Sequence, residues 1–165
     1  MKNPVIIFLQ RILATVFFLG YIPLASGTIG SAVTAVALYW FVYRTHMPVS
    51  ALWWWSVGLA ATAFSVLVAS RPKEIFGEDD PSEVIIDEVA GQFISFLFIP
   101  ISIKTLILGF FLFRFFDIVK PFPVHNMESL EGGLGITMDD VAAGVLTNVS
   151  MLAILYGYHF VKHLL

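Results

Sequence analysis

The sequence predicts an all-α integral membrane protein, a helical bundle that includes short or re-entrant segments. Hydrophobic residues make up 58% of the 165 residues and charged residues only 13%, far below the roughly 25% charged residues of a soluble domain. The mean hydropathy is +0.87. The organised polar residues fall in four motifs at the edges of apolar runs: Ser26 to Ser31, Asp79 to Gln92, Phe113 to Pro123 and Gly132 to Gly144. We expect these four motifs to gather at one membrane face.

Composition excludes several classes of protein. The net charge is -3 and no long basic run is present, so nucleic-acid binding is not expected. The chain has no Cys, which excludes disulfides, thiolate nucleophiles and thiolate metal sites, so oxygen or imidazole would have to hold any metal. No internal repeat or linker divides the sequence. We therefore expect residues 1–165 to form a single membrane-embedded domain.

The first apolar run extends from Pro4 to Leu24 and is expected to form a tilted or interfacial helix. Its positive start at Lys2 is superficially similar to a secretory signal peptide, but Gln10 and Arg11 lie in the middle of the run and argue against one. Arg11 is expected to face protein or to extend to the membrane surface.

Two further apolar runs cover Ala32 to Tyr43 and Val49 to Ala69. The second is long enough to span a bilayer, whereas the first falls short of the roughly 20 residues that a crossing needs. The first is therefore expected to be re-entrant or to extend into SGTIGS (Ser26 to Ser31), which is expected to be a loop. If the two runs cross the membrane and return, SGTIGS lies at the same face as the later motifs.

A helical hairpin is expected next. Its first helix runs from about Pro81 to Phe98, the chain breaks at Pro100, and the second helix runs from about Ile103 to Val119. A final helix is expected from about Met138 to Val161, after an aqueous loop with a Gly cluster.

The start of this hairpin carries a helix-capping pattern. Asp80 is expected to cap the helix, Pro81 to be its first residue and Glu83 to complete a capping box. The alternative is that Asp80 and Glu83 contact metal or substrate. Asp87 lies about 14 residues before the turn and Asp117 about 15 after it, so a rise of 1.5 Å per residue places them level on neighbouring helices.

Five carboxylates are expected at this level: Asp87, Glu88, Asp117, Asp139 and Asp140. An ionisable residue in a membrane segment is a functional hypothesis by default. Without a cation these groups repel one another, and Mg²⁺ suits a site of oxygen ligands best. The side chains of adjacent residues in a helix point in directions about 100° apart. In each adjacent pair, one member is therefore expected to bind metal, and the other to contact a second metal, a water or a cation such as Arg114 or Lys120.

The remaining polar residues suit a phosphate. SGTIGS offers two Gly and the hydroxyls of Thr28 and Ser31, which is typical of an anion site of backbone N–H groups, although an ordinary Gly-containing turn would read the same way. Arg114 and Lys120 add positive charge, unless Arg114 merely neutralises Asp117 at i, i+3. By elimination, metal-activated water is the simplest nucleophile. His125 is read as a surface residue.

The order of SGTIGS, IIDEVAGQ, FRFFDIVKPFP and GGLGITMDDVAAG closely resembles the bacterial phosphatidylglycerophosphatase A family over nearly the whole chain. Ser26 departs from the pattern, because a Pro before the GT pair is more typical. The family's three polar patterns match the following positions: Asp87 and Glu88 for the DE pair; Arg114, Asp117, Lys120 and Pro121 for FR..D..KP; and Gly132, Gly133, Gly135, Asp139, Asp140 and Gly144 for GG.G...DD..AG.

The resemblance implies Mg²⁺-dependent removal of the terminal phosphate of phosphatidylglycerophosphate, which gives phosphatidylglycerol in phospholipid biosynthesis. It also implies a multi-pass protein of the bacterial inner membrane with its active site toward the cytoplasm, an orientation that counting positive charges leaves undecided. The expected partners are a phospholipid substrate and the membrane. The alternatives are a phosphatase for another lipid phosphomonoester, a small ion or phosphate transporter, and a noncatalytic assembly subunit. The sequence does not predict the oligomeric state.

Overall fold

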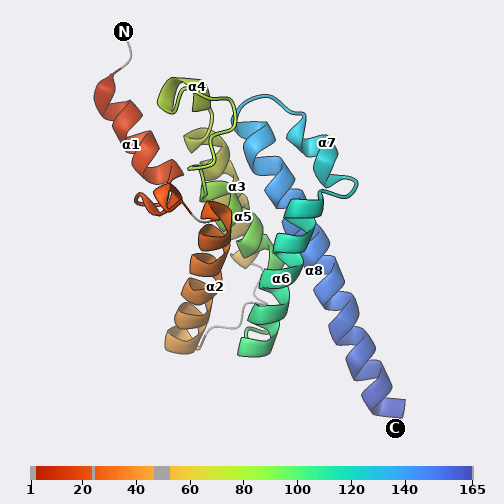
Figure 1. The fold of residues 1–165 in the computed structure, drawn as a ribbon. Coiled ribbons are helices and arrows are strands. Elements are labelled where there is room, and N and C mark those ends of the chain that lie inside the picture. Colours follow the sequence, from red (N-terminus) through yellow and green to blue (C-terminus); the bar gives the residue numbers. More distant parts are fainter. Residues whose placement is uncertain (1–2, 24, 47–52, 165) are drawn as a thin grey trace.

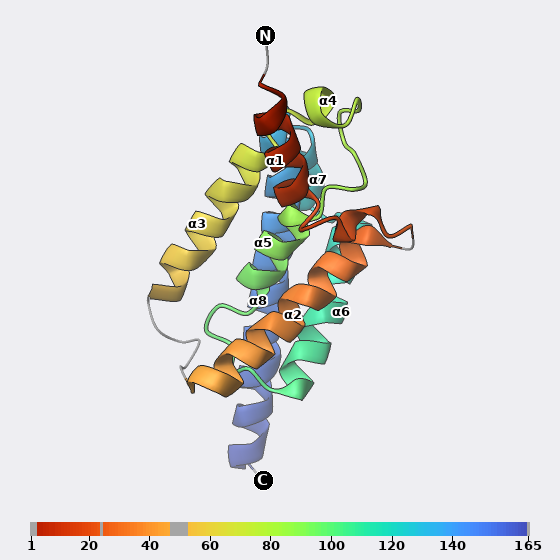
Figure 2. The ribbon, with the colours of Figure 1, turned by 90° about the vertical axis from the view of Figure 1, so that its left-hand side faces the viewer.

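A computed structural model describes residues 3–23, 25–46 and 53–164, and this part of the chain is helical without any strand. Five helices run alternately down and up to form a bundle, which Figures 1 and 2 show from two sides: α2 (Ser26–Thr45), α3 (Trp53–Val68), α5 (Ile86–Ser95), α6 (Ile103–Val119) and α8 (Gly133–Leu164). Short elements lie toward one end of the bundle: α1 (Pro4–Ala14), η1 (Leu19–Tyr21), α4 (Pro72–Ile75) and α7 (Val124–Glu128).

The short helix α5 lies at the centre of the bundle. Although it has only 10 residues, it packs against α2, α3, α6 and α8. Gly91 of α5 and Gly144 of α8 mark a close crossing, because a Cβ on Gly144 would overlap the carbonyl group of Gly91. A short helix enclosed by longer ones confirms the prediction of short segments. It also brings the first turn of α5 directly beside α8.

The predicted hairpin of α5 and α6 is confirmed and α6 has the predicted bounds, but α5 is shorter than the predicted Pro81 to Phe98 and ends at Ser95. Ser102 and Thr105 form a capping box that starts α6 after the break at Pro100. The helix ends at Val119, its C-cap Lys120 adopts a left-handed conformation, and Pro121 follows.

The capping box predicted at Asp80 and Glu83 is wrong. The helix α5 begins at Ile86, and its cap residue Ile85 makes no side-chain cap hydrogen bond. Residues 81–85 instead fold into turns beneath α1, where the Ile85 N–H donates to the Ala14 carbonyl at 3.0 Å. Val84 and Ile85 are almost fully buried there. Burial of these two apolar side chains therefore outweighs the local capping signal.

The predicted SGTIGS loop is also wrong, because these six residues form the first turns of α2. The alternative, in which the apolar run extends into SGTIGS, is confirmed and gives a helix of 20 residues. The predicted start of the next run at Val49 lies outside the described residues. The last helix begins at Gly133 rather than Met138, since Gly133 packs closely on the backbone of Val66 in α3 and of Ser70 just after it. The predicted loop is shorter for that reason.

The first helix, α1, ends at Ala14, well before the predicted Leu24. A turn with left-handed residues from Val16 to Phe18 then leads into η1. Arg11 is expected either to face protein or to extend to the membrane surface, and it faces protein. Its Nη2 donates to the Ile75 carbonyl of α4, and its guanidinium lies 5.6 Å from the centre of the Phe76 ring.

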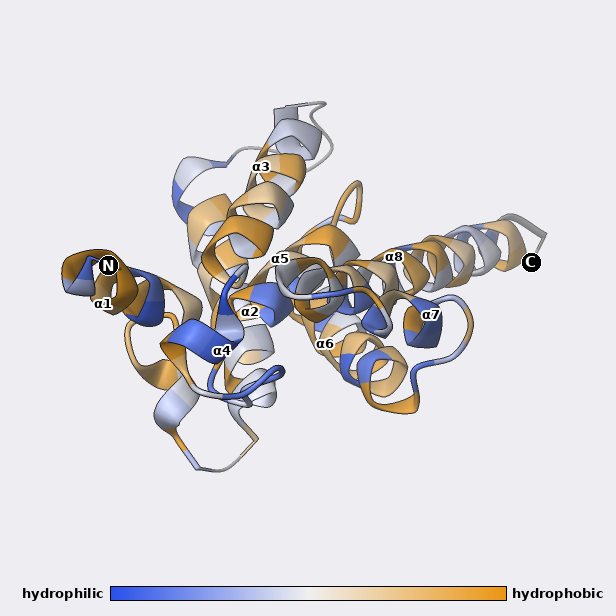
Figure 3. Cartoon of the chain, turned by 90° about the horizontal axis from the view of Figure 1, so that it is seen from above, coloured by the Kyte–Doolittle hydropathy of each residue, from blue (hydrophilic) through white to orange (hydrophobic). Residues whose placement is uncertain are grey.

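The bundle is that of a helical membrane protein. Helices α2 and α8 are each long and apolar enough to cross a bilayer. Large apolar side chains are exposed around the bundle, among them Val36 on α2, Phe111 on α6 and Val149 on α8. Figure 3 views the molecule from the end that carries α4 and α7, and hydrophilic residues are concentrated there. The polar motifs therefore share one end of an otherwise apolar molecule.

Candidate active site

A cleft of about 860 Å³ opens at the polar end of the bundle. The helices α5 and α8 begin at this end and α6 finishes there, so residues far apart in the sequence meet. Asp87 and Asp117 line the same cleft, as the helix rise predicts. The cleft is lined by these predicted site residues: Asp87, Glu88, Arg114, Asp117, Lys120, Asp139 and Asp140.

Three of the five carboxylates form a compact group. Asp87, Glu88 and Asp140 each offer an oxygen atom, and the three oxygens lie within 4.8 Å of one another. Among the described residues, the buried oxygens Glu88 Oε2 and Asp140 Oδ1 have no hydrogen-bond partner. Buried carboxylates without partners are costly, so this group has the ligand chemistry and the unmet charge that a hard cation would satisfy.

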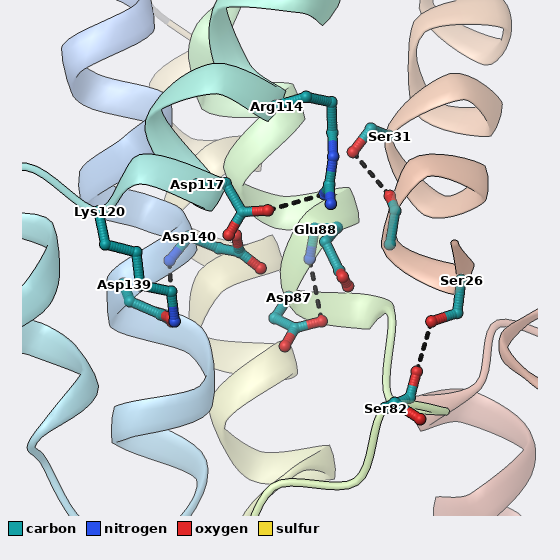
Figure 4. A network of polar contacts seen from close by, with 11 residues as sticks. Ser26, Ser31, Ser82, Asp87, Glu88, Arg114, Asp117, Lys120, Asp139 and Asp140 are labelled. Atoms are coloured by element: carbon teal, nitrogen blue, oxygen red, sulfur yellow. Dashed lines mark hydrogen bonds and ion pairs between the residues drawn. The ribbon is translucent and has the colours of Figure 1, made fainter. Parts of the chain in front are cut away.

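The other two carboxylates are paired with basic side chains. Asp117 Oδ2 lies 2.9 Å from Arg114 Nη1, and Asp139 Oδ2 accepts a hydrogen bond from Lys120 Nζ at 2.9 Å. Figure 4 shows Lys120 and Asp139 at one side of the group and Arg114 at another. The carboxylates therefore divide into three without a basic partner among the described residues and two with one. In the pair 139/140, Asp139 is the member that contacts a cation.

Lys120 also contacts a residue that the sequence did not point to. Its Nζ donates to Glu128 Oε1 of α7 at 2.8 Å. Burial of the Lys120 ammonium disfavours its charge, but hydrogen bonds to Glu128 and Asp139 outweigh that effect and raise the pKa of Lys120 above its ordinary value. The cleft thus keeps a fixed positive charge beside its carboxylates.

The first turn of α2 forms the wall opposite α8. A Cβ on Gly27 would overlap Glu88 Oε1 and lie 3.0 Å from Arg114 Nη1, so any larger residue there would have to displace these side chains. Ser26, the residue that departs from the family pattern, donates through Oγ to the Ser82 carbonyl at 2.6 Å and ties α2 to the segment before α5. The N-terminus of α2 therefore lies at the cleft, where its free N–H groups favour an anion.

Two predicted phosphate contacts do not line the cleft. The Ser31 hydroxyl is buried and donates to the Gly27 carbonyl at 2.8 Å within α2. Thr28 is half-buried and also lies off the cleft wall. The physical reason is that SGTIGS is helical, which turns these side chains away and leaves Ala25, Ser26 and Gly27 on the wall.

Other residues on the wall carried little or no sequence signal. Lys73 and Asp79 line the rim as an ion pair of 2.8 Å, and Glu128 and Glu131 come from the segment around α7. Asp80 lines the cleft although it caps no helix. His125 is exposed, as predicted, and lies 3.6 Å from Glu128. No fixed spacing in the sequence links Glu128 to Lys120, so only the fold brings them together.

Comparisons with known proteins point to one family. The family described as Phosphatidylglycerophosphatase A matches residues 12–155. A Bacteroides thetaiotaomicron protein, provisionally described as a phosphatidylinositol-3-phosphatase, is 38% identical over 150 residues, which cover 88% of this chain and 91% of that protein. The Escherichia coli phosphatidylglycerophosphatase A is 29% identical over 168 residues, covering 97% and 87% of the two chains. The Haemophilus influenzae phosphatidylglycerophosphatase A is 43% identical over 82 residues, about half of each chain. No solved structure matches significantly.

Proposed function

The chain belongs to the phosphatidylglycerophosphatase A family and is a phosphatase, and on this premise we propose that it hydrolyses the terminal phosphate of phosphatidylglycerophosphate to give phosphatidylglycerol. The observation that carries the proposal is the polar cleft, in which a cluster of carboxylates lies beside two basic side chains at the end of an apolar bundle. Such a cleft can receive an anionic headgroup whose acyl chains stay in the membrane.

The proposed cofactor is Mg²⁺, held by Asp87, Glu88 and Asp140. The support is the group of three oxygens within 4.8 Å, two of whose side chains carry buried oxygens without a hydrogen-bond partner in the described residues. Oxygen ligands from a few carboxylates, together with substrate phosphate oxygens, are typical of Mg²⁺ sites. When bound, the ion would neutralise the carboxylates, polarise the phosphate and make a water more acidic.

The two basic residues are proposed to bind the phosphate. Arg114 has two buried donors, Nε and Nη1, that lack a hydrogen-bond partner in the described part of the chain, although Nη1 is ion-paired with Asp117. Lys120 is held by Asp139 and Glu128 and stays protonated. We assign to Asp117 and Asp139 the role of orienting these two cations. The N-terminus of α2 at Gly27 adds backbone N–H groups.

The hydrolysis itself requires water as the second substrate. The water oxygen forms a bond to phosphorus and loses a proton, while the bond from phosphorus to the glycerol oxygen breaks and that oxygen takes up a proton. The products are phosphatidylglycerol and inorganic phosphate. Arg114 and Lys120 hold the oxygens of the transferred phosphoryl group and stabilise its developing charge.

The proposed setting is the inner membrane of a bacterium, with several crossings and the cleft toward the cytoplasm, where the chain would contribute to phospholipid biosynthesis. Its support is the family membership, together with two helices long enough to cross a bilayer. A phosphomonoester headgroup reaches the cleft from the adjacent leaflet in this arrangement, without leaving the membrane.

A second candidate function is hydrolysis of a phosphorylated inositol lipid. The observation that favours it is the Bacteroides thetaiotaomicron relative, which matches 88% of this chain at 38% identity and is provisionally described as a phosphatidylinositol-3-phosphatase. Both substrates are lipid phosphomonoesters, so the same carboxylates and basic residues would serve either. The two substrates differ in the headgroup to which the phosphate is attached.

Phosphate release from a panel of lipid phosphomonoesters tests the proposal. Purified protein in detergent should release inorganic phosphate fastest from phosphatidylglycerophosphate, and only with Mg²⁺. Faster release from a phosphorylated inositol lipid would favour the second candidate. No release from any lipid phosphomonoester would overturn both candidate functions and would favour a transporter.

A further inference from the structure

A second hollow lies on the membrane-facing side of the bundle, between α2 and α6. It has a volume of about 340 Å³ and is lined by α2 from Ala32 to Tyr39 and by α6 from Ile103 to Phe111. Its floor includes Ala35 and Leu106, which are each more than 90% buried. Its rim includes Val36, Ile107 and Phe111, whose side chains are largely exposed. We call this hollow the α2/α6 groove.

The α2/α6 groove has a fixed shape. Ala35 and Leu106 belong to the main apolar core, together with residues of α3, α5 and α8, so the floor is held by the rest of the bundle. The small side chains of Ala32 and Ala35 leave space between the larger residues of the rim. A groove of this kind exists before any ligand arrives, which lowers the entropic cost of binding.

The upper end of the α2/α6 groove lies next to the polar cleft. Both walls continue into it: Ala32 lies less than two turns from Gly27 on α2, and Phe110 lies one turn from Arg114 on α6. Gly27 and Arg114 line the cleft beside Glu88. Figures 1 and 2 both show α2 and α6 side by side below this end. The polar site and the apolar groove therefore share their two walls.

The length of the α2/α6 groove suits a lipid chain. From Arg114 down to Ile103, α6 extends by roughly 16 Å at 1.5 Å per residue. One leaflet contributes half of a hydrocarbon core about 30 Å thick, which is about the same depth. A lipid with its phosphate in the cleft can thus place one acyl chain along the groove without bending it out of its leaflet.

We propose that the α2/α6 groove is the binding site for one acyl chain of the substrate lipid. This inference rests on the proposed function, and it adds a second point of attachment to the headgroup contacts in the cleft. The occupant is the substrate's own chain rather than a lipid of the surrounding bilayer, because the groove leads from the cleft that holds the substrate's phosphate. Its role is to anchor the substrate, so it governs KM more than kcat.

A pair of matched substitutions on α2 tests this site. Ala32→Phe fills the upper end of the α2/α6 groove, whereas Ala37→Phe places the same side chain at an exposed position of α2 outside the groove. The probes are long-chain and short-chain forms of phosphatidylglycerophosphate at one mole fraction in the same detergent micelles. The measured quantity is the ratio of kcat/KM for the long-chain form to kcat/KM for the short-chain form.

Ala32→Phe should lower this ratio by about tenfold or more, through KM, since that is the loss expected when two or more methylene groups leave an apolar site. Ala37→Phe should change it by less than about twofold. Equal effects of the two variants, or an unchanged ratio in Ala32→Phe, would overturn the proposal and assign the groove to bulk lipid. If wild type releases no phosphate from either form, the proposed function itself fails, which is a distinct result.

A second pair on α6 covers the case in which Ala32→Phe does not fold. Phe111→Ala removes an exposed part of the rim and leaves the core untouched, and Phe115→Ala removes an exposed ring one turn away that does not line the groove. Phe111→Ala should lower the long-chain to short-chain ratio several-fold, and Phe115→Ala should leave it unchanged. No difference between these two variants would also contradict the proposal.

Discussion

Asp139 and Asp140 are consecutive on α8, yet their carboxylates have different partners. Asp139 Oδ2 accepts a hydrogen bond from Lys120 at 2.9 Å, whereas Asp140 joins Asp87 and Glu88 in a group of oxygens within 4.8 Å. Both residues are more than 90% buried. Because the two residues are similarly buried but have different partners, their variants can distinguish a loss of metal binding from a loss of the contact that positions Lys120.

Removal of the Asp140 charge should weaken metal binding directly. We expect Asp140→Asn to lower phosphate release by about 10² or more and to raise the Mg²⁺ concentration needed for half-maximal rate. Asp139→Asn should lower the rate while leaving that concentration unchanged, because Lys120 keeps its hydrogen bond to Glu128. Initial rates against Mg²⁺ concentration measure both quantities.

Glu78→Gln is the control for these variants, since Glu78 is exposed and does not line the cleft. It should retain wild-type rates. Near wild-type phosphate release by Asp140→Asn at saturating Mg²⁺ would show that Asp140 is structural and would refute this assignment.

Much of the bundle could be predicted from local signals. Pro100 and Pro121 delimit α6, and the capping pair Ser102 and Thr105 lies where the sequence breaks. The start of α5 could not be predicted, because burial of Ile85 beneath α1 is a long-range contact that outweighs the cap signal at Asp80. Helix propensity and capping contribute less to the free energy of folding than burial of such an apolar side chain does.

The composition of the site was predictable, but its internal pairing was not. The sequence places all five carboxylates and both basic residues near one level, and all seven line the cleft. Which carboxylate meets which cation depends on the rotation of α6 and α8 about their axes, which packing decides. The contact of Lys120 with Glu128 depends further on the position of α7.

Gly27 gives a prediction about the wall of the cleft. A methyl group there would overlap Glu88 and approach Arg114, so Gly27→Ala should displace both side chains and lower phosphate release by more than about tenfold. The protein should still fold, because the cleft is open on one side. Gly157→Ala is the matched control, as a Cβ on Gly157 meets nothing within 4 Å. Equal rates of phosphate release for the two variants would show that a methyl group at Gly27 does not disturb Glu88 and Arg114.

The carboxylate group should destabilise the protein when no metal is bound. Asp87→Asn removes one of three mutually repelling charges, so in EDTA this variant should melt no lower than wild type. Added Mg²⁺ should raise the melting temperature of wild type more than that of the variant, since binding to the folded state stabilises it. Thermal denaturation in detergent, with and without Mg²⁺, measures this. A variant that melts well below wild type in EDTA would show a structural role for Asp87.

The crossing of α5 and α8 gives a prediction about stability. A Cβ on Gly144 would overlap the backbone of Gly91, so Gly144→Ala should force the two helices apart. We expect a loss of about 1–3 kcal/mol in the free energy of unfolding, as for other overpacked sites. Activity should fall as well, because Asp140 lies one turn away on α8. Gly157→Ala again serves as the control, and a similar melting temperature for the two variants would contradict the close crossing.

We propose that Asp87, Glu88 and Asp140 hold a Mg²⁺ ion needed for hydrolysis of phosphatidylglycerophosphate. The most direct measurement is the rate of inorganic phosphate release from this lipid by purified wild-type protein, first stripped of metal with EDTA and then supplied with Mg²⁺. We predict no release after EDTA treatment and full recovery with Mg²⁺. Undiminished release in EDTA by protein with negligible metal content would contradict the claim.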